Sequence, residues 1–412
     1  MDLKANQQRV MKELERLAEF SDAPAPAVTR VVFSQADLEA RRFVKAECTA
    51  AGLAVREDAV GNTFARWAGA EPELPAVGTG SHIDAIPHSG RYDGTVGVLG
   101  GLEAVRVLQE TGFRPRRSIE LVMFTSEEPT RFGIGCLGSR LLSGSLDASA
   151  GERLKDSDGR SLNEVRQGAG FDGSLADVRL PRGHYHAFME LHIEQGLLLE
   201  RKQIPIGVVT AIAAPASLRI TIEGEGGHAG AVLMSDRRDA FLGACEIALA
   251  LEAAAKATGA IDTVATTGVC QVFPGAVNSI PSRVQLAVDV RDINEARRDH
   301  VLGSLARACE RVAAVRGLKM EREVLNADAP AVCDAMAVEA LTAACAEQGA
   351  GFDKMVSRAY HDSLFVSRIA PAAMLFIPCR AGVSHRPDEY ASPEAIARGV
   401  GVLAAALRRL AG

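Results

Sequence analysis

The sequence lacks the features that mark three specialised classes of protein. Its 412 residues carry a formal net charge of −6, so no excess of basic side chains favours nucleic acid or an anionic membrane surface as a partner. None of its apolar runs approaches the ~20 residues that a membrane-spanning helix needs. Its eight cysteines are scattered without a CxxC pair, which argues against a disulfide scaffold and indicates a reducing compartment. We therefore expect a cytoplasmic protein that binds neither nucleic acid nor membranes.

The N-terminal segment, residues 1–20, is not typical of a targeting signal. It is rich in charged and amide side chains, and its apolar residues include Val10, Leu14 and Leu17. Because this spacing places the apolar side chains on one face of a helix, we predict an amphipathic helix rather than a signal peptide.

What the chain does contain is an alternation of apolar runs and helical stretches. Four short apolar runs predict buried strands, at residues 76–80, 119–125, 187–192 and 372–378. Longer stretches such as 96–112 predict helices, so we expect an α/β fold with a mixed, mostly parallel sheet. In open sheets of this kind, functional side chains gather beyond the carboxyl ends of the strands. His82, His192 and the pair Glu127-Glu128 each follow an apolar run closely, so we expect them to meet at one edge.

The segment 214–326 has a different pattern. Alternating apolar residues predict strands at 218–223 and 284–291, and longer stretches predict helices at 236–256 and 297–316. This order predicts an inserted α+β domain.

The remainder of the chain is expected to form one discontinuous domain. A helix at 331–349 and the last apolar run return to the first sheet, so we predict a catalytic domain made of residues 1–213 and 327–412. Residues 147–183, rich in Gly, Asp and Ser, predict a long surface excursion.

Five side chains in separate loops match the donors of a dinuclear metal site. Two divalent ions about 3.5–4 Å apart act together when protein donors and a water surround them, and one carboxylate usually bridges them. We assign Asp93 as the bridge, with His82 and His192 completing one ion and Glu128 and His385 completing the other. Imidazole and carboxylate donors without thiolates suit zinc, manganese, cobalt or nickel, and this donor set leaves the choice open.

Two further carboxylates have other predicted roles. Asp84, two residues after His82, is expected to orient that imidazole by accepting its second N–H. Glu127 and Glu128 are neighbours whose side chains diverge, so one is expected to bind metal and the other to face the substrate. We assign Glu127 as the general base, which takes a proton from water and passes it to a leaving amine. The predicted chemistry is metal-assisted hydrolysis.

Several of these residues also have a simpler interpretation. A histidine in a glycine-rich loop often caps or hydrogen-bonds the chain, and Glu127-Glu128 could cap the following helix. The occurrence of five possible metal donors in separate loops favours a functional site over these structural roles. Residues 133–138 formally fit the GxGxxG dinucleotide fingerprint, but residues 127–132 separate them from their strand, so a tight helix entry is the better interpretation. Cys136 within this stretch is interpreted as a packing residue.

Three polar residues of the inserted segment could bind a substrate. His228 lies among glycines, and Asn278 and Arg291 flank the second alternating stretch. Arginine can match a carboxylate with two hydrogen bonds, and His or Asn can donate to a developing oxyanion. Surface or turn roles fit their spacing equally well.

At these motifs the chain resembles the dinuclear-metal amidohydrolases of the aminoacylase and carboxypeptidase superfamily. The resemblance runs nearly end to end and lies in the branch of N-carbamoyl-L-amino-acid, allantoate and ureidoglycolate amidohydrolases. The stretches that carry it are Gly80-Ser-His-Ile-Asp84, Tyr92-Asp-Gly94, Ser126-Glu-Glu128, Glu190-Leu-His-Ile-Glu-Gln-Gly196, Gly227-His-Ala-Gly230 and Ser384-His385. Two more, Asp84-Ala-Ile-Pro-His-Ser-Gly-Arg-Tyr-Asp93 and Ser357-Arg-Ala-Tyr-His-Asp-Ser363, are most similar to the plant-type ureidoglycolate amidohydrolases.

The resemblance implies hydrolysis of ureidoglycolate to glyoxylate, ammonia and carbon dioxide in purine nitrogen recovery. It implies two manganese ions, with zinc, cobalt or nickel as alternatives. It also implies a homodimer in which the inserted domain dimerises and closes as a lid, with His228 reaching the partner's active site. Gln195, Asn278 and Arg291 would contact a ureido substrate that carries a carboxylate. The sequence departs from the plant-type enzymes at two positions. Arg380 and Val383 stand where those enzymes are expected to carry aromatic residues.

Three alternatives stay open from the sequence. An N-carbamoyl-L-amino-acid hydrolase or an allantoate amidohydrolase would use the same chemistry with a different pocket. A dipeptidase or aminoacylase of the wider superfamily would cleave substrates that lack a ureido group. A non-catalytic binding protein would be expected to lose Glu127 or a ligand, and none is missing.

Overall fold

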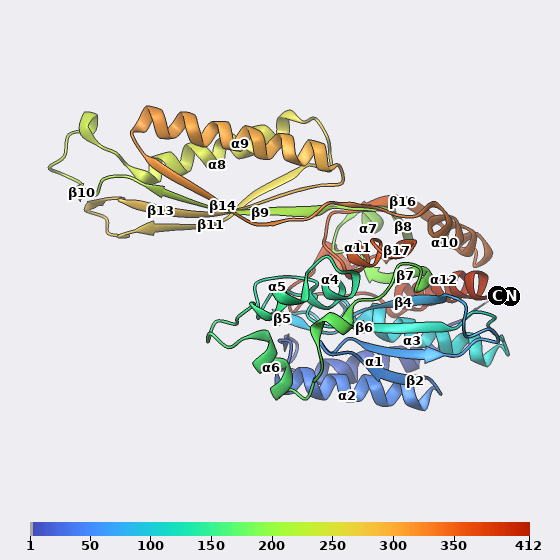
Figure 1. Cartoon of the computed structure of the whole chain (residues 1–412). Coiled ribbons are helices and arrows are strands. Elements are labelled where there is room, and N and C mark those ends of the chain that lie inside the picture. Colours follow the sequence, from blue (N-terminus) through green and yellow to red (C-terminus); the bar gives the residue numbers. More distant parts are fainter. Residues whose placement is uncertain (1–2) are drawn as a thin grey trace. The chain divides into compact units, whose positions relative to one another are not determined.

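The computed structural model describes residues 3–412, and the chain divides into two compact units (Figure 1). Unit 1 contains the described residues up to Thr210 together with Cys333–Ser357 and His361–Gly412. Unit 2 contains Ala211–Val332 and Arg358–Tyr360. The predicted insertion, 214–326, lies inside the first segment of unit 2. The roles of the units as catalytic domain and lid stay predictions.

Unit 1 is built on a mixed sheet whose centre is parallel. The parallel strands are β4 (Ala76–His82), β6 (Ile119–Phe124), β7 (Tyr185–Ile193) and β17 (Ala372–Ile377). They are buried along nearly their whole length, which is why the sequence shows them as continuous apolar runs. The strand order is β15-β8-β17-β7-β4-β6-β3-β2, with β16 beside β8. The predicted sheet type and all four predicted strands are confirmed.

Among the described residues, five further strands flank this centre. They are β2 (Ala54–Glu57), β3 (Thr63–Trp67), β8 (Ile206–Ile212), β15 (Ala331–Val332) and β16 (Phe352–Ser357), while β1 (Val28–Arg30) and β5 (Ala85–Ser89) pair separately. The helix predicted at 331–349 begins later than expected, because β15 precedes it and Asp334 caps α10 (Ala335–Glu347). The Asp334 carboxylate accepts the N–H groups of the first turn, which fixes where the helix starts.

The long helices of unit 1 pack against the sheet or against one another and hold the segments that precede them. They are α1 (Gln7–Glu19), α2 (Gln35–Ala50), α3 (Thr95–Glu110), α10 and α12 (Pro393–Ala411). The predicted amphipathic helix is confirmed as α1, with Val10, Leu14 and Leu17 buried, while Met1 and Asp2 of that prediction lie outside the described residues. α3 packs against β4, β6 and β7, and α12 packs against α3, β7 and β17. The residues just before α3 and α12 are thereby held near the ends of the central strands.

The predicted surface excursion, residues 147–183, is corrected by the structure. It contains α5 (Ala148–Glu152), α6 (Leu162–Gly168) and a short 3₁₀ helix at Leu175–Val178. Leu162, Val165 and Phe171 are buried in the same core as Phe64. The Gly, Asp and Ser residues of this stretch supply turns and caps, such as the capping box of Ser161 at the start of α6. Polar composition therefore marked the ends of short packed elements rather than an exposed loop.

Unit 2 is an antiparallel sheet, in the order β11-β13-β9-β14, with two helices on one face (Figure 1). Its main elements are β9 (Ala214–Glu223), α8 (Ala240–Ala257), β11 (Val264–Phe273), β13 (Arg283–Asp292), α9 (Glu295–Arg316) and β14 (Lys319–Ala327). Alternating residues of β9 and β13, such as Ile220 and Val288, form a core with α8 and α9. The separate antiparallel α+β arrangement confirms the predicted class of the insertion. The edge strands β11 and β14 escaped prediction. β14 carries exposed charged residues such as Glu321, Arg322 and Glu323, and β11 exposes apolar and polar residues alike, so neither shows a clear alternation.

Two whole-chain features bear on the expected class of protein. Among the described residues, no helix is long and apolar enough to cross a membrane. All eight cysteines are free thiols, in agreement with the scattered pattern of the sequence.

Candidate metal centre

The five predicted ligands lie together at the carboxyl edge of the parallel strands of unit 1. His82 ends β4, His192 lies near the end of β7 and Glu128 follows β6, while Asp93 precedes α3 and His385 precedes α12. Two sets of three side chains each have ligand atoms within 4.8 Å of one another. The His82 group is His82, Asp93 and His192, and the His385 group is Asp93, Glu128 and His385. The structure thus brings together all five residues that the sequence singled out.

Asp93 belongs to both groups, and its two oxygens face different sides. Oδ1 is 3.1 Å from Nε2 of His192 and 3.6 Å from Nε2 of His82. Oδ2 is 3.4 Å from Nε2 of His385, and that same nitrogen is 3.2 Å from Oε1 of Glu128. A carboxylate with one oxygen toward each group has the geometry of a bridge between two cations.

The rings of the His82 group turn their Nε2 atoms toward this carboxylate, and Nε2 of His192 also accepts the N–H of Gly94 at 3.1 Å. Nδ1 of His82 is 3.0 Å from the carbonyl oxygen of Asp84, and Nδ1 of His192 is 2.9 Å from the carbonyl oxygen of Ile193. Because a carbonyl oxygen only accepts, Nδ1 carries the proton in each ring and Nε2 of the neutral ring is a lone pair. Lone pairs that face carboxylate oxygens are stabilised by a cation between them. The donor set therefore fits a divalent metal ion.

The electrostatics of the site are those of opposite charges buried together. Burial would lower the pKa of His82, but the Glu127, Asp93 and Asp84 carboxylates raise it well above its usual range. Burial would raise the pKa of Asp93, but the imidazoles of His192, His385 and His82 hold it well below its usual range. The carboxylates around His82 thus attract a positive charge, a proton or a metal ion, to its Nε2, and the ionised form of Asp93 is the form that a metal ligand must have.

Asp84 contacts a different partner from the one predicted. Its Oδ1 is 3.7 Å from Nδ1 of His82, beyond hydrogen-bond distance, and its carbonyl oxygen orients that ring instead. The Asp84 carboxylate accepts the N–H of Glu127 at 3.2 Å and the N–H of Glu128 at 3.0 Å. The predicted contact is therefore corrected, because this carboxylate fixes the backbone that carries the two glutamates.

Glu127 is buried beside the His82 group without belonging to it. Its Oε2 is 3.8 Å from Nε2 of His82, and its Oε1 is 3.6 Å from Sγ of Cys136. Burial raises the pKa of Glu127 well above its usual range, and Glu128 adds to this against the opposing charge of His82. A carboxyl group with a raised pKa is suited to accept and release a proton. Cys136 is fully buried, as its interpretation as a packing residue requires, and its thiol also points at this carboxylate.

The backbone adopts left-handed conformations where it aims these side chains. Ser126, Gln195 and His385 have φ values of 56°, 55° and 59°, which residues with a side chain rarely adopt. Such conformations cost ~1–3 kcal/mol each and persist only where the surroundings impose them. Gly94, next to Asp93, has φ 65°, and a Cβ there would lie 2.4 Å from Nε2 of His82. Glycine is therefore needed beside the bridging carboxylate.

The residues that hold Asp93 lie far from it in the sequence. The Glu389 carboxylate accepts the N–H of Asp93 across a separation of 296 residues, and Ser384 Oγ donates to Asp93 Oδ2 at 2.5 Å. Burial and the nearby Asp93 raise the pKa of Glu389 to about 7. Gln195, predicted to contact substrate, donates its amide N–H to the same Oδ2 at 2.6 Å. The Ser384-His385 and Glu190–Gly196 motifs pointed to Ser384 and Gln195, and nothing in the sequence pointed to Glu389.

A third set of nearby donor side chains, Glu190, His192 and His361, lies beside the metal centre and shares His192 with it. The Glu190 carboxylate accepts the hydroxyl of Ser81 at 2.7 Å and the hydroxyl of Ser363 at 2.5 Å. The ring of His361 packs edge-on against that of His192, with centroids 4.6 Å apart. Both oxygens of Glu190 already accept hydrogen bonds, so this set does not form another ion site. Its role is to hold the ring of His192 in place.

The predicted substrate residues of unit 2 do not lie together. His228 lies in β10 (Gly227–His228), and the N–H of Ala229 donates to the carbonyl oxygen of Asn278 at 2.9 Å. Arg291 lies near the other end of β13, where its Nε donates to Asp289 at 2.7 Å. The two ends of the unit thus carry these three residues, and their roles toward a substrate stay predictions.

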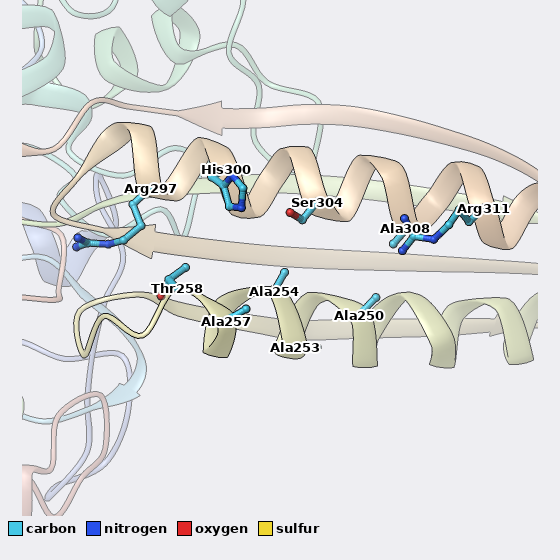
Figure 2. Close-up of a pocket in the computed structure, with 10 residues that line it drawn as sticks. All are labelled: Ala250, Ala253, Ala254, Ala257, Thr258, Arg297, His300, Ser304, Ala308 and Arg311. Carbon is cyan, nitrogen blue, oxygen red and sulfur yellow. The ribbon is translucent and has the colours of Figure 1, made fainter.

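Two other features lie outside this centre. A hollow of about 490 Å³ lies between α8 and α9. Its lining residues, alanines of α8 and polar residues of α9 such as Arg297 and His300, are drawn in Figure 2. None of the predicted site residues lines it. Arg380, the departure from the plant pattern, stacks its guanidinium 4.8 Å from the ring centroid of Tyr390 and donates to the carbonyl oxygen of Asp388.

Comparison with known proteins assigns this centre to a family. The family model of "Peptidase family M20/M25/M40" matches residues 78–409, a range that holds all five predicted ligands. The chain belongs to this family. The dinuclear metal site expected from the sequence is a property of the family, whereas the identity of the ions stays a prediction.

The most similar relatives place the chain in the predicted amidohydrolase branch. It is 52% identical over 408 residues to the ureidoglycolate hydrolase of Arabidopsis thaliana, covering 97% of this chain and 86% of that protein. It is 38% identical to the N-carbamoyl-L-amino acid amidohydrolase of Geobacillus stearothermophilus, covering 96% of each. The crystal structure of AtUAH in complex with (S)-hydroxyglycine matches with a TM-score of 0.91 at 50% identity, covering 99% of this chain and 98% of that one. The predicted hydantoinase/carbamoylase branch and fold are confirmed.

Proposed function

We propose that this chain hydrolyses ureidoglycolate, releasing ammonia and carbon dioxide and leaving hydroxyglycine, which decays to glyoxylate. The observation that carries the proposal is the 52% identity with a ureidoglycolate hydrolase along nearly the whole chain. The complete set of five converging donors supports it, since a protein of this kind without catalysis would be expected to lack one of them. The activity would place the chain in purine nitrogen recovery.

The ligand roles follow the two groups of donors. His82, His192 and the shared Asp93 hold one divalent ion. Glu128, His385 and Asp93 hold the other. When bound, the ions supply a Lewis acid for the ureido carbonyl and activate a water for attack. Manganese is the proposed metal, and zinc, cobalt and nickel are alternatives that the same donors accept.

Glu127 is the proposed general base and general acid. Its carboxylate lies beside the His82 group, where it takes a proton from the attacking water as the ureido carbon is attacked. It then delivers that proton to the leaving nitrogen, and the raised pKa of the group suits both steps. Asp84 holds the Glu127 backbone N–H and so keeps the carboxylate in position.

Recognition of the substrate carboxylate is assigned to Arg291 and Asn278, with Gln195 and His228 completing the contacts. Because Asn278 lies beside His228, at the opposite end of β13 from Arg291, these two residues would join Arg291 only from the partner subunit. An arginine can grip a carboxylate with two hydrogen bonds. We propose a homodimer in which unit 2 dimerises and closes as a lid, so that His228 reaches the partner's site. Closure would exclude water from the reacting groups. These assignments rest on the family resemblance.

An N-carbamoyl-L-amino-acid hydrolase is the second candidate, favoured by 38% identity with such an enzyme. Both activities hydrolyse a ureido group, so the metal centre does not distinguish them. The residues that contact the rest of the substrate decide which of the two activities the chain has.

Substrate preference tests the proposal. The manganese-loaded protein is incubated separately with racemic ureidoglycolate, allantoate and N-carbamoyl-L-amino acids, and ammonia is measured in each, with glyoxylate measured in the first. We expect ureidoglycolate to be turned over preferentially with release of glyoxylate. Preference for a carbamoyl amino acid would keep the mechanism and move the enzyme to the second candidate.

A further inference from the structure

Glu389 lies at the junction between the two ligand-bearing segments that are farthest apart in the sequence. It follows His385 by four residues and is buried, with a side chain only 4% exposed. Its Oε1 accepts the N–H of Tyr92 at 2.7 Å and the N–H of Asp93 at 3.1 Å. One carboxylate oxygen thus holds the turn that presents the bridging ligand.

The other oxygen of Glu389 completes a closed set of contacts. Ser384 Oγ donates to Oδ2 of Asp93 at 2.5 Å and lies 3.1 Å from Oε2 of Glu389, so the two carboxylates share this one hydroxyl. Gly90, at the start of the Asp93 turn, packs so tightly that an added Cβ would lie 2.3 Å from Cβ of Glu389. We call Glu389, Ser384 and the Asp93 turn the carboxylate clamp.

The two groups of ligands depend on this clamp to different degrees. The rings of His82 and His192 are buried, and each has its own carbonyl partner on Nδ1. The His385 ring is 47% exposed, its backbone is left-handed, and its Nδ1 has no hydrogen-bond partner among the described residues. What fixes His385 is therefore its backbone, and its neighbour Ser384 is tied to Asp93 and Glu389.

We propose that Glu389 is a positioning residue that makes the His385 group a metal site, by clamping the segment that carries His385 onto the turn that carries Asp93. The inference rests on the ligand roles proposed above and deepens them. Partners that orient ligands typically change metal affinity by about 10–100-fold when they are removed. Loss of Glu389 should therefore weaken the ion of the His385 group by about that factor and affect the ion of the His82 group less.

Metal titration of matched variants tests the clamp. The metal-free protein is titrated with Mn²⁺ by calorimetry, bound manganese is counted after dialysis, and thermal unfolding is followed with and without Mn²⁺. In E389A we expect one ion bound as in the wild type and a second bound about 10–100-fold more weakly. E389Q keeps an acceptor for the two N–H groups and an amide that can donate to Ser384 Oγ, so it should bind both ions nearly as the wild type does.

Two more variants keep the result interpretable. S384A removes one link of the clamp and should weaken the second ion in the same direction by a smaller factor, which decides the question if E389A does not fold. D334A removes a carboxylate that likewise accepts two backbone N–H groups in unit 1, at the start of α10, far along the chain from any ligand. It should lower thermal stability and leave both manganese affinities unchanged.

The outcomes separate the clamp from the ligand assignment. Two ions bound by E389A and S384A with wild-type affinity would overturn the clamp alone. Equal loss of both ions in E389A would also overturn it, since Glu389 would then hold the whole centre rather than the His385 group. A wild-type protein that binds fewer than two ions would overturn the ligand roles and the clamp with them.

Discussion

The two units of this chain hold their polar residues in opposite ways. In unit 1 the carboxylates and imidazoles of the metal centre are mostly buried, and their neighbours fix them through hydrogen bonds, as Asp84 does for the two glutamates. In unit 2 His228 and Asn278 are exposed at one end, and Arg291 is paired with Asp289 at the other. Unit 1 therefore fixes the side chains of its centre through many contacts within the unit, whereas the predicted substrate residues of unit 2 have few such contacts.

The difference follows from the kinds of sheet. A parallel sheet gathers the ends of several strands at one edge, so residues from distant segments meet there. An antiparallel sheet with short connections spreads successive loops over both ends. If this comparison is right, changes in unit 1 should alter metal binding and the chemical step, and changes in unit 2 should alter substrate affinity or local stability only.

The largest effect is expected at Glu127. E127Q removes the proton acceptor, so kcat for ureidoglycolate should fall by ~10²–10⁴-fold. Manganese content should stay at the wild-type value because Glu127 belongs to neither ligand group. The control is E120Q, the same change at a buried residue of β6 that accepts the hydroxyl of Tyr185, which should leave kcat within a few-fold. Turnover of E127Q near the wild-type rate would refute its role as base.

The variants D93A and H385A should differ in how strongly Mn²⁺ stabilises them. Saturation with an ion at 100 times its Kd stabilises a protein by about 2.7 kcal/mol per site, so Mn²⁺ should raise the melting temperature of the wild-type protein markedly. D93A should show almost no such rise, because both groups share this residue, and H385A should keep part of it. A chelator should abolish the rise in all proteins. Equal responses of D93A and H385A would contradict a shared bridge.

In unit 2 the expected effect is on substrate affinity. R291K loses the two-pronged grip on a carboxylate, and a hydrogen bond to a charged group is worth about 1.5–3 kcal/mol, so KM should rise by roughly 10–100-fold. Manganese affinity should not change. R283K, on the same strand β13 with its guanidinium over the ring of Phe273, is the matched control and should leave KM unchanged. An altered metal affinity in R291K would break the comparison between the units.

The smallest effect is expected from helix caps. D239A removes the carboxylate that accepts the N–H groups of Phe241 and Leu242 at the start of α8, and this should cost about 1 kcal/mol in the free energy of unfolding of unit 2. Denaturant unfolding measures it. The stabilisation by Mn²⁺ should be the same as in the wild-type protein, and its loss in D239A would show that the two units do not behave separately.

Prediction from sequence succeeded where a residue's role is marked by its immediate neighbours. The strands β4, β6, β7 and β17 were found because burial on both faces makes them continuously apolar. It failed where burial depends on distant partners. The segment around Phe171 is polar in composition but packs into the core, and the edge strand β14 is polar because only one of its sides is paired.

The sequence by itself determined the chemistry that this chain can support. Continuous apolar runs predict the parallel strands of a mixed α/β fold, and His82, Glu128 and His192, at or just after these runs, are expected at one edge because strand ends are local properties. Asp93 and His385 lie in loops before helices and were assigned by their donor type. The tertiary structure decided which groups hold those donors. Asp84 turned its carboxylate to the backbone of Glu127 and Glu128, and Glu389 met Asp93 across 296 residues. Such contacts depend on the path of the whole backbone, and no local pattern of residues encodes them.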